Sequence, residues 1–109
     1  MSKLTLMLDD TGKSFEVRRG DIITIQLKEN RTTPYRWKLK SDTETHILPL
    51  QDSRYSLPKE PKFGEDGVLT LTFKAISVGT ASIQLKHWCE WEGESSVSDR
   101  FDVSISVVD

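Results

Sequence analysis

Apolar and polar residues alternate along five stretches of this chain. The apolar members are Leu4, Leu6 and Leu8; Ile23, Ile25 and Leu27; Leu69, Leu71 and Phe73; Ala81, Ile83 and Leu85; and Phe101, Val103, Ile105 and Val107. Strict alternation places one face of a strand on a core and the other in water, which is typical of antiparallel sheets. Apolar residues at helical spacing are not sustained over three turns anywhere in the sequence. The pattern therefore predicts an all-β fold.

Glycines and prolines divide these stretches into separate strands. Gly12, Gly20 and Gly79 mark turns, while the segment from Ser41 to Phe63 carries three of the chain's four prolines and alternates poorly. Because proline is excluded from central strands, this segment is expected to hold one or two short edge strands and a long connection. Seven or eight short strands with such turns predict an immunoglobulin-like antiparallel β-sandwich.

Composition narrows the class of protein further. At 109 residues the chain is expected to form one domain, residues 1–109, and its single cysteine excludes an internal disulfide. A net charge of −2 gives no general attraction to nucleic acid or anionic lipid, and the apolar runs are too short for a membrane span. The chain opens without the hydrophobic region of a signal peptide. It is therefore expected to be cytoplasmic as written, or vesicular or secreted if a leader has been removed.

The sequence offers no positive argument for catalysis or for a cofactor. Cys89 and His87 would share one face of a strand, but their Cα atoms would stand roughly 6.5 Å apart, which is awkward for a catalytic dyad. A half-buried cysteine and a surface histidine are the expected interpretation. Together with His46 these residues give three candidate zinc ligands without a ligand-pair spacing. No enzyme activity, metal or cofactor is expected.

A polar turn, Asn30 to Tyr35, separates the segment from Asp21 to Leu27 from an aromatic one that includes Trp37. By itself this turn could be a generic hairpin connection. However, Thr32 and Thr33 are stiff β-branched residues at the tip, and the following proline favours an extended conformation at the second of them. The sequence predicts a pre-shaped wedge, the first loop, whose base is anchored by Tyr35 and Trp37.

Two further loops follow along the chain. The second loop, Gly64 to Gly67, precedes an alternating strand that ends in Lys-Ala, and alone it would be read as an exposed turn. The third loop carries Trp91 and Gly93, with an Arg-Phe pair downstream. One tryptophan is more often a core residue. Because Trp88 lies in the same glutamate-rich, glycine-broken stretch, at least one exposed ring is expected.

The order and spacing of the three loops resemble those of the chagasin-type inhibitors of papain-like cysteine proteases. The first loop matches the family's sequence at Asn30, Thr32, Thr33, Tyr35 and Trp37. It departs at Arg31, where the family has proline, and at Pro34, where the family has glycine. In the third loop Cys89-Glu90 replaces the family's Arg-Pro, so that Trp88 is the candidate for added apolar contact. Restoring the family residues at positions 31 and 34 is expected to preserve or strengthen binding.

The resemblance implies a reversible, tight-binding protein inhibitor of papain-family cysteine proteases, and no enzyme. Thr32 and Thr33 would occlude the centre of the cleft, the second loop would pair along one side, and Trp91 would pack on the other. The implied protease-binding residues are Asn30, Arg31, Thr32, Thr33, Pro34, Tyr35, Gly64, Glu65, Asp66, Gly67, Trp88, Trp91 and Gly93. The free inhibitor is expected to be a monomer.

Two other functions are compatible with a sandwich of this kind. A glycan- or peptide-binding module would use its exposed tryptophans as stacking platforms, and it would tolerate loss of Thr32 and Thr33. A purely structural domain of a larger assembly is disfavoured because the sequence has no long apolar edges.

Overall fold

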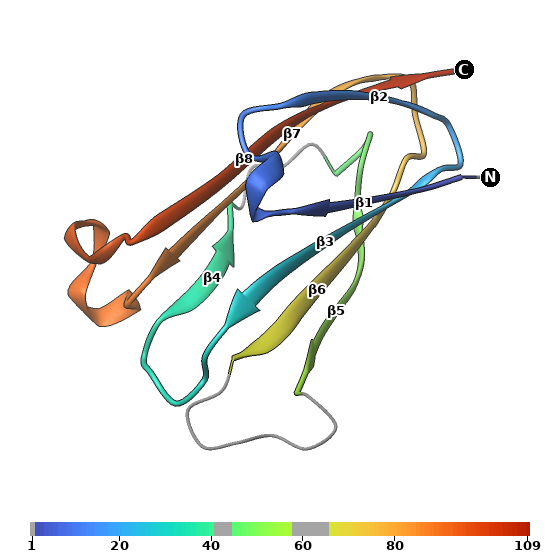
Figure 1. The fold of residues 1–109 in the computed structure, drawn as a ribbon. Helices are drawn as coiled ribbons and strands as arrows, with labels where there is room; N and C mark the ends of the chain where they lie inside the picture. Colours follow the sequence, from blue (N-terminus) through green and yellow to red (C-terminus); the bar gives the residue numbers. More distant parts are fainter. Residues whose placement is uncertain (1, 41–44, 58–65) are drawn as a thin grey trace.

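The computed structural model describes residues 2–40, 45–57 and 66–109, which form two four-stranded sheets facing each other (Figure 1). The first sheet has the order β1 (Lys3–Met7), β3 (Ile22–Glu29), β6 (Gly67–Lys74) and β5 (Leu50–Ser56). The second has the order β2 (Ser14–Arg18), β8 (Asp99–Val108), β7 (Gly79–Trp88) and β4 (Arg36–Leu39). Three short 3-10 segments, η1 (Leu8–Asp10), η2 (Glu90–Glu92) and η3 (Glu94–Ser96), complete the described elements. The predicted β-sandwich of seven or eight strands is confirmed.

The direction of two strand pairs differs from the prediction. β1 runs parallel to β3, and β2 runs parallel to β8, whereas all other described pairs are antiparallel. The prediction of an antiparallel sandwich is therefore wrong for these pairs, and both sheets are mixed. The cause is that the chain crosses from one sheet to the other between β1 and β2 through η1, so neither strand joins its partner by a hairpin. β2 was also missing from the predicted stretches.

The core lies between the sheets and consists mostly of the residues that the alternation marked. Ile23, Ile25 and Phe73 of the first sheet and Ile83, Phe101 and Ile105 of the second are fully buried. Leu8 is an exception, because it lies in η1 and is partly exposed. The proline-rich segment contributes the edge strand β5, as expected, and buries Ile47 and Leu48 against the core. None of the helical segments among the described residues is long and apolar enough to cross a bilayer.

Candidate functional site

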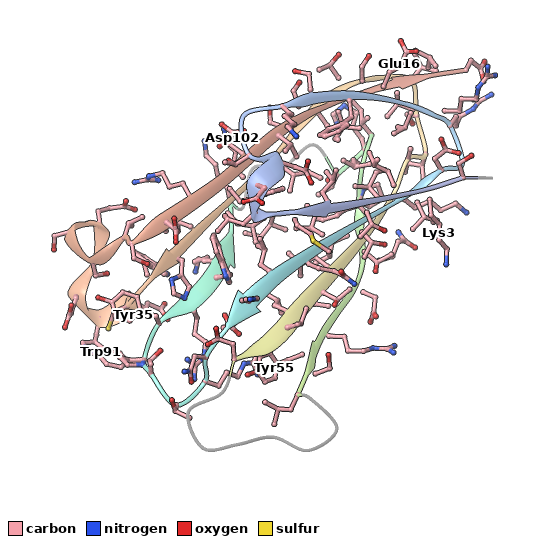
Figure 2. All side chains as sticks on the ribbon, in the orientation of Figure 1. Lys3, Glu16, Tyr35, Tyr55, Trp91 and Asp102 are labelled. Atoms are coloured by element: carbon pink, nitrogen blue, oxygen red, sulfur yellow. The ribbon has the colours of Figure 1, made fainter. Side chains whose placement is uncertain are left out.

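The described parts of the candidate loops lie at one end of the sandwich. Glu29, the last residue of β3, is the pairing partner of Gly67, the first residue of β6. Arg36, the first residue of β4, pairs with Trp88, the last residue of β7. The end of β3, the start of β6 and the end of β7 therefore share one edge of the molecule. Figure 2 shows Tyr35, Tyr55 and Trp91 at this end.

Asn30 shapes the tip of the first loop. Its carbonyl oxygen accepts hydrogen bonds from the Thr33 amide at 3.2 Å and from the Thr33 hydroxyl at 2.8 Å. Its side-chain oxygen accepts a bond from the Thr32 amide at 3.0 Å. In a turn of this kind, in which an asparagine side chain bonds to the backbone two residues on, backbone amides are bonded within the loop and not to water. Thr32, Thr33 and Pro34 remain exposed, so the tip is an internally bonded wedge, as the sequence predicted.

Arg36 holds the inner side of the same loop. Its guanidinium donates to the carbonyl oxygens of Thr33 and Tyr35, and more distantly, at 3.4 Å, to that of Arg31. A charged donor makes stronger hydrogen bonds than a neutral one. The carbonyl oxygens of the loop therefore point inward, towards Arg36 and β4.

Tyr35 and Trp37 anchor the base of the loop, which confirms that prediction. Both rings lie against His87, with ring centroids 5.5 Å and 5.0 Å from that of the imidazole. The indole N–H of Trp37 donates to the carbonyl oxygen of Lys28 at 3.0 Å. His87 was expected at the surface, but it is half-buried, because its position continues the inward alternation of β7. Its Nδ1 lies 2.8 Å from the Ser98 hydroxyl.

The second loop is described only in part. Gly64 and Glu65 lie outside the described residues, and Asp66 is exposed. Gly67 was expected in an exposed turn, but it is buried and opens β6. A Cβ atom at this position would stand 2.4 Å from the ring of Tyr55 and 2.7 Å from the carbonyl oxygen of Ser56. Only glycine leaves room for the tyrosine there.

The third loop presents one tryptophan to solvent. Trp91, in η2, is 76% exposed, which confirms the expectation of at least one exposed ring. Trp88 is half-buried, with the ammonium of Lys86 3.5 Å from its ring centroid. Gly93 separates the two 3-10 segments at φ 77°, a left-handed conformation that side chains disfavour.

A buried serine closes the third loop. The Ser96 hydroxyl accepts a hydrogen bond from the Cys89 amide at 2.9 Å and lies 2.7 Å from the carbonyl oxygen of Gly93. Cys89 was expected to be half-buried, but it is fully buried, since it too continues the inward alternation of β7. The imidazole of His87 is engaged by Ser98 instead of the thiol. Among the described residues, no three His, Cys, Asp or Glu side chains form a candidate metal site.

An exposed ion-pair network ties the third loop to the second sheet. Glu94 is hydrogen-bonded to Lys86, and Arg100 Nη2 lies 3.3 Å from its other oxygen. The bond from Lys86, followed by the charges of both cations, lowers the pKa of the Glu94 carboxyl. Because the folded-state pKa is lowered, the tie contributes stability above the ordinary pKa of a glutamate and loses it as pH falls through the lowered value.

This network predicts the titration of the third loop. In a carboxyl-detected NMR titration, Glu94 should protonate at lower pH than an ordinary glutamate. Lys86→Met should bring the Glu94 pKa back towards its ordinary value, while Lys3→Met, at the opposite end of the sandwich, should leave it unchanged. A Glu94 pKa that is insensitive to Lys86→Met would contradict the assignment of the tie.

Glu29, Arg36, Tyr55 and Ser96 are site residues that the sequence prediction missed. Glu29 had a readable signal, because it extends the inward series of Ile23, Ile25 and Leu27 by one more step. It is only 1% exposed. The other three are recognisable only by contacts that the fold creates.

Comparisons with known proteins agree on one family. Residues 16–105 match the family described as chagasin family peptidase inhibitor I42. Chagasin of Trypanosoma cruzi is 26% identical over 95 residues, which cover 84% of this chain and 86% of that protein. Amoebiasin-2 of Entamoeba histolytica is 29% identical over 73 residues, which cover 67% of this chain and 59% of that protein.

Solved structures share the fold. The cysteine protease inhibitor EhICP2 from Entamoeba histolytica superposes with a TM-score of 0.89 at 22% identity, over 99% of this chain and 97% of that one. PbICP-C, solved in complex with falcipain-2, superposes with a TM-score of 0.69 at 14% identity, over 99% of this chain and all of that one. Because the family match spans most of the sequence, the chain belongs to the chagasin family of peptidase inhibitors.

Proposed function

We propose that this protein is a reversible, tight-binding inhibitor of papain-family cysteine proteases. The observation that carries the proposal is the loop end of the sandwich, in a chain that matches the inhibitor family over residues 16–105. There an exposed and internally bonded Thr32-Thr33 tip stands at the same end as an exposed Trp91. One relative in fold, PbICP-C, has been solved bound to falcipain-2.

The residues of the three loops have different roles in the proposal. Thr32, Thr33 and Pro34 enter the cleft, and Trp91 packs beside it. The remaining members of the proposed site are Asn30, Arg31, Tyr35, Gly64, Glu65, Asp66, Gly67, Trp88 and Gly93. Asn30 and Gly93 act by shaping their loops. The Asn30 side chain accepts a hydrogen bond from the Thr32 amide, and Gly93 adopts a left-handed backbone conformation. Pre-shaped loops lose less conformational entropy on binding, which favours affinity.

The first loop also suggests why the inhibitor is not cut. The Thr33 carbonyl oxygen is bonded to Arg36, on the inhibitor side of the loop. The bond after it leads to Pro34, whose nitrogen carries no hydrogen. For cleavage, this carbonyl oxygen would have to leave Arg36 and enter the oxyanion hole of the protease. If the bond were cut, the rigid loop would hold the two new ends in place. The complex would therefore last, and it would still be reversible.

The alternative of a glycan-binding module would have one open tryptophan ring to stack on, because the other two rings are engaged within the protein. Trp91 is strongly exposed, but the Trp88 ring is covered by Lys86 and the Trp37 ring lies on His87. Stacking on sugar rings needs open aromatic faces. The family comparisons also give this alternative no support.

Titration into papain, followed with a fluorogenic peptide, tests the proposal. Inhibition should be competitive, and active protease should be recovered when the complex dissociates, because nothing in the described loops is an electrophile that could trap the thiol. Thr32→Gly together with Thr33→Gly should weaken inhibition, whereas Lys3→Ala, at the opposite end, should leave it unchanged. Absence of inhibition at equimolar protein, or permanent loss of the protease thiol, would refute the mechanism.

A further inference from the structure

A carboxylate lies buried beneath the first loop. Glu29 is 1% exposed, yet both of its oxygens have donors. Oε1 accepts a hydrogen bond from the Trp37 amide at 2.7 Å, and Oε2 accepts one from Arg31 Nε at 2.9 Å. The two donors lie on opposite sides of the loop, so one carboxylate holds both of its ends.

Arg31 is bound on a second side as well. Its guanidinium carbon lies 3.9 Å from the ring centroid of Tyr55, a cation–π contact. The Tyr55 hydroxyl in turn donates to the backbone carbonyl oxygen of Glu29 at 2.9 Å. Tyr55 belongs to β5, and it packs over Gly67 at the start of β6. The loop is thereby tied to the strands on either side of the second loop.

We propose that Glu29 and Arg31 form a clamp that positions the first loop for the protease, so that Arg31 acts inside the inhibitor and not on its target. This inference rests on the proposed function and deepens it. Glu29 and Arg31 are positioning residues in this mechanism, and Tyr55 couples them to β5. The exposed residues Thr32, Thr33 and Pro34 are left as the tip that meets the protease.

The alternative role for Arg31 is a direct contact with the protease. Its side chain is 46% exposed, so a partner could reach it. However, moving the guanidinium to a partner would leave Glu29 buried with the Trp37 amide as its remaining donor. A buried charge that loses its partner is strongly unfavourable. Binding through Arg31 would therefore oppose the folding of the loop that carries it.

The clamp also changes the expectation for the family residue at position 31. Proline would supply rigidity through its fixed φ, but it would remove the guanidinium that neutralises Glu29. Arg31→Pro in this chain should therefore weaken inhibition, unless Glu29 is made neutral at the same time. In this sequence a charge pair replaces the stiffness that proline supplies elsewhere in the family.

A double-mutant cycle of inhibition constants tests the clamp. The variants are Glu29→Gln, Arg31→Met and the two combined, measured against papain well below the lowest melting temperature. Each single change should weaken inhibition about tenfold, because one loop residue must then be ordered on binding. The double variant should be no weaker than Arg31→Met alone. If Arg31 instead contacted the protease, Arg31→Met would cause the same loss in both backgrounds and Glu29→Gln would have little effect, which would overturn the proposal.

Hydrogen exchange supplies a readout that needs no protease. The Thr33 amide, which is bonded to Asn30, should exchange about tenfold faster in Arg31→Met than in the unmodified protein. Arg54→Met is the matched control, since Arg54 lies beside Tyr55 on β5 but pairs with the exposed Asp52. It should change neither exchange nor inhibition. Unchanged exchange in Arg31→Met would overturn the clamp, whereas failure of the unmodified protein to inhibit papain would refute the proposed function and leave exchange to decide the clamp.

Discussion

Trp91→Ala should weaken inhibition roughly thirtyfold while leaving the melting temperature of the free inhibitor unchanged. The indole is 76% exposed in the free protein, and Trp91 is not among the side chains that pack against the core. Its truncation therefore removes little from the folded state. Aromatic anchors at interface centres commonly contribute about 2 kcal/mol or more to binding, which corresponds to the expected factor. The measurements are an inhibition constant against papain and a thermal melt.

Ile76→Ala provides the matched control for this prediction. Ile76 is another exposed apolar side chain, but it follows β6 at the end of the sandwich opposite the loops. Its truncation should change neither inhibition nor melting. If Trp91→Ala unfolds the protein, or inhibits as well as the unmodified protein, Trp91 is not the anchor and Trp88 becomes the remaining tryptophan candidate.

Trp37→Ala should act mainly on stability. The ring packs partly against the core, lies 5.0 Å from His87 between centroids, and donates its N–H to Lys28. Full truncation of a buried tryptophan costs 3–5 kcal/mol, so about 2–3 kcal/mol is expected for this half-buried ring. For a domain of this size the melting temperature should fall by roughly 10–20 °C. Inhibition measured well below that melting point should change less than it does in Trp91→Ala.

Trp37→Phe separates the ring from its hydrogen bond. Phenylalanine keeps an aromatic face against His87 but cannot donate to Lys28, so most of the lost stability should return. A melting temperature as low as that of Trp37→Ala would assign the effect to the hydrogen bond and not to packing. If Trp37→Ala instead weakens binding without lowering the melting temperature, the assignment of inner and outer tryptophans is reversed.

The core was predictable because its rule is local. In a strand, successive side chains point to opposite faces, so the runs that include Ile23, Leu71 and Val103 mark the inner face from the sequence alone. Strand direction was not predictable in the same way, since alternation is identical in parallel and antiparallel strands. β2 was not predicted, because Phe15 and Val17 are the only apolar residues in this short and otherwise polar strand.

The exposed loop residues of the candidate site were predictable from the sequence, but the buried residues that hold the loops in place were not. The exposed Thr32-Thr33 tip and the exposed Trp91 follow from local turn residues. Glu29 accepts a hydrogen bond at its backbone carbonyl oxygen from Tyr55 of another strand, and the ring of the same tyrosine leaves room only for glycine at Gly67. Contacts between residues far apart in sequence arise only when the sheets have formed.

The parallel pairing of β2 with β8 makes the folding of the second sheet depend on segments that lie far apart in the sequence. β2 spans Ser14–Arg18 and β8 spans Asp99–Val108, and β8 is the strand that pairs with β2 in the described structure. β8 also pairs with β7, the strand that leads into the third loop. Pairings between distant segments pay the cost of loop closure before they gain contacts, which places folding on the order of milliseconds to seconds. The strand that supports the third loop is therefore itself held by a pairing between distant segments.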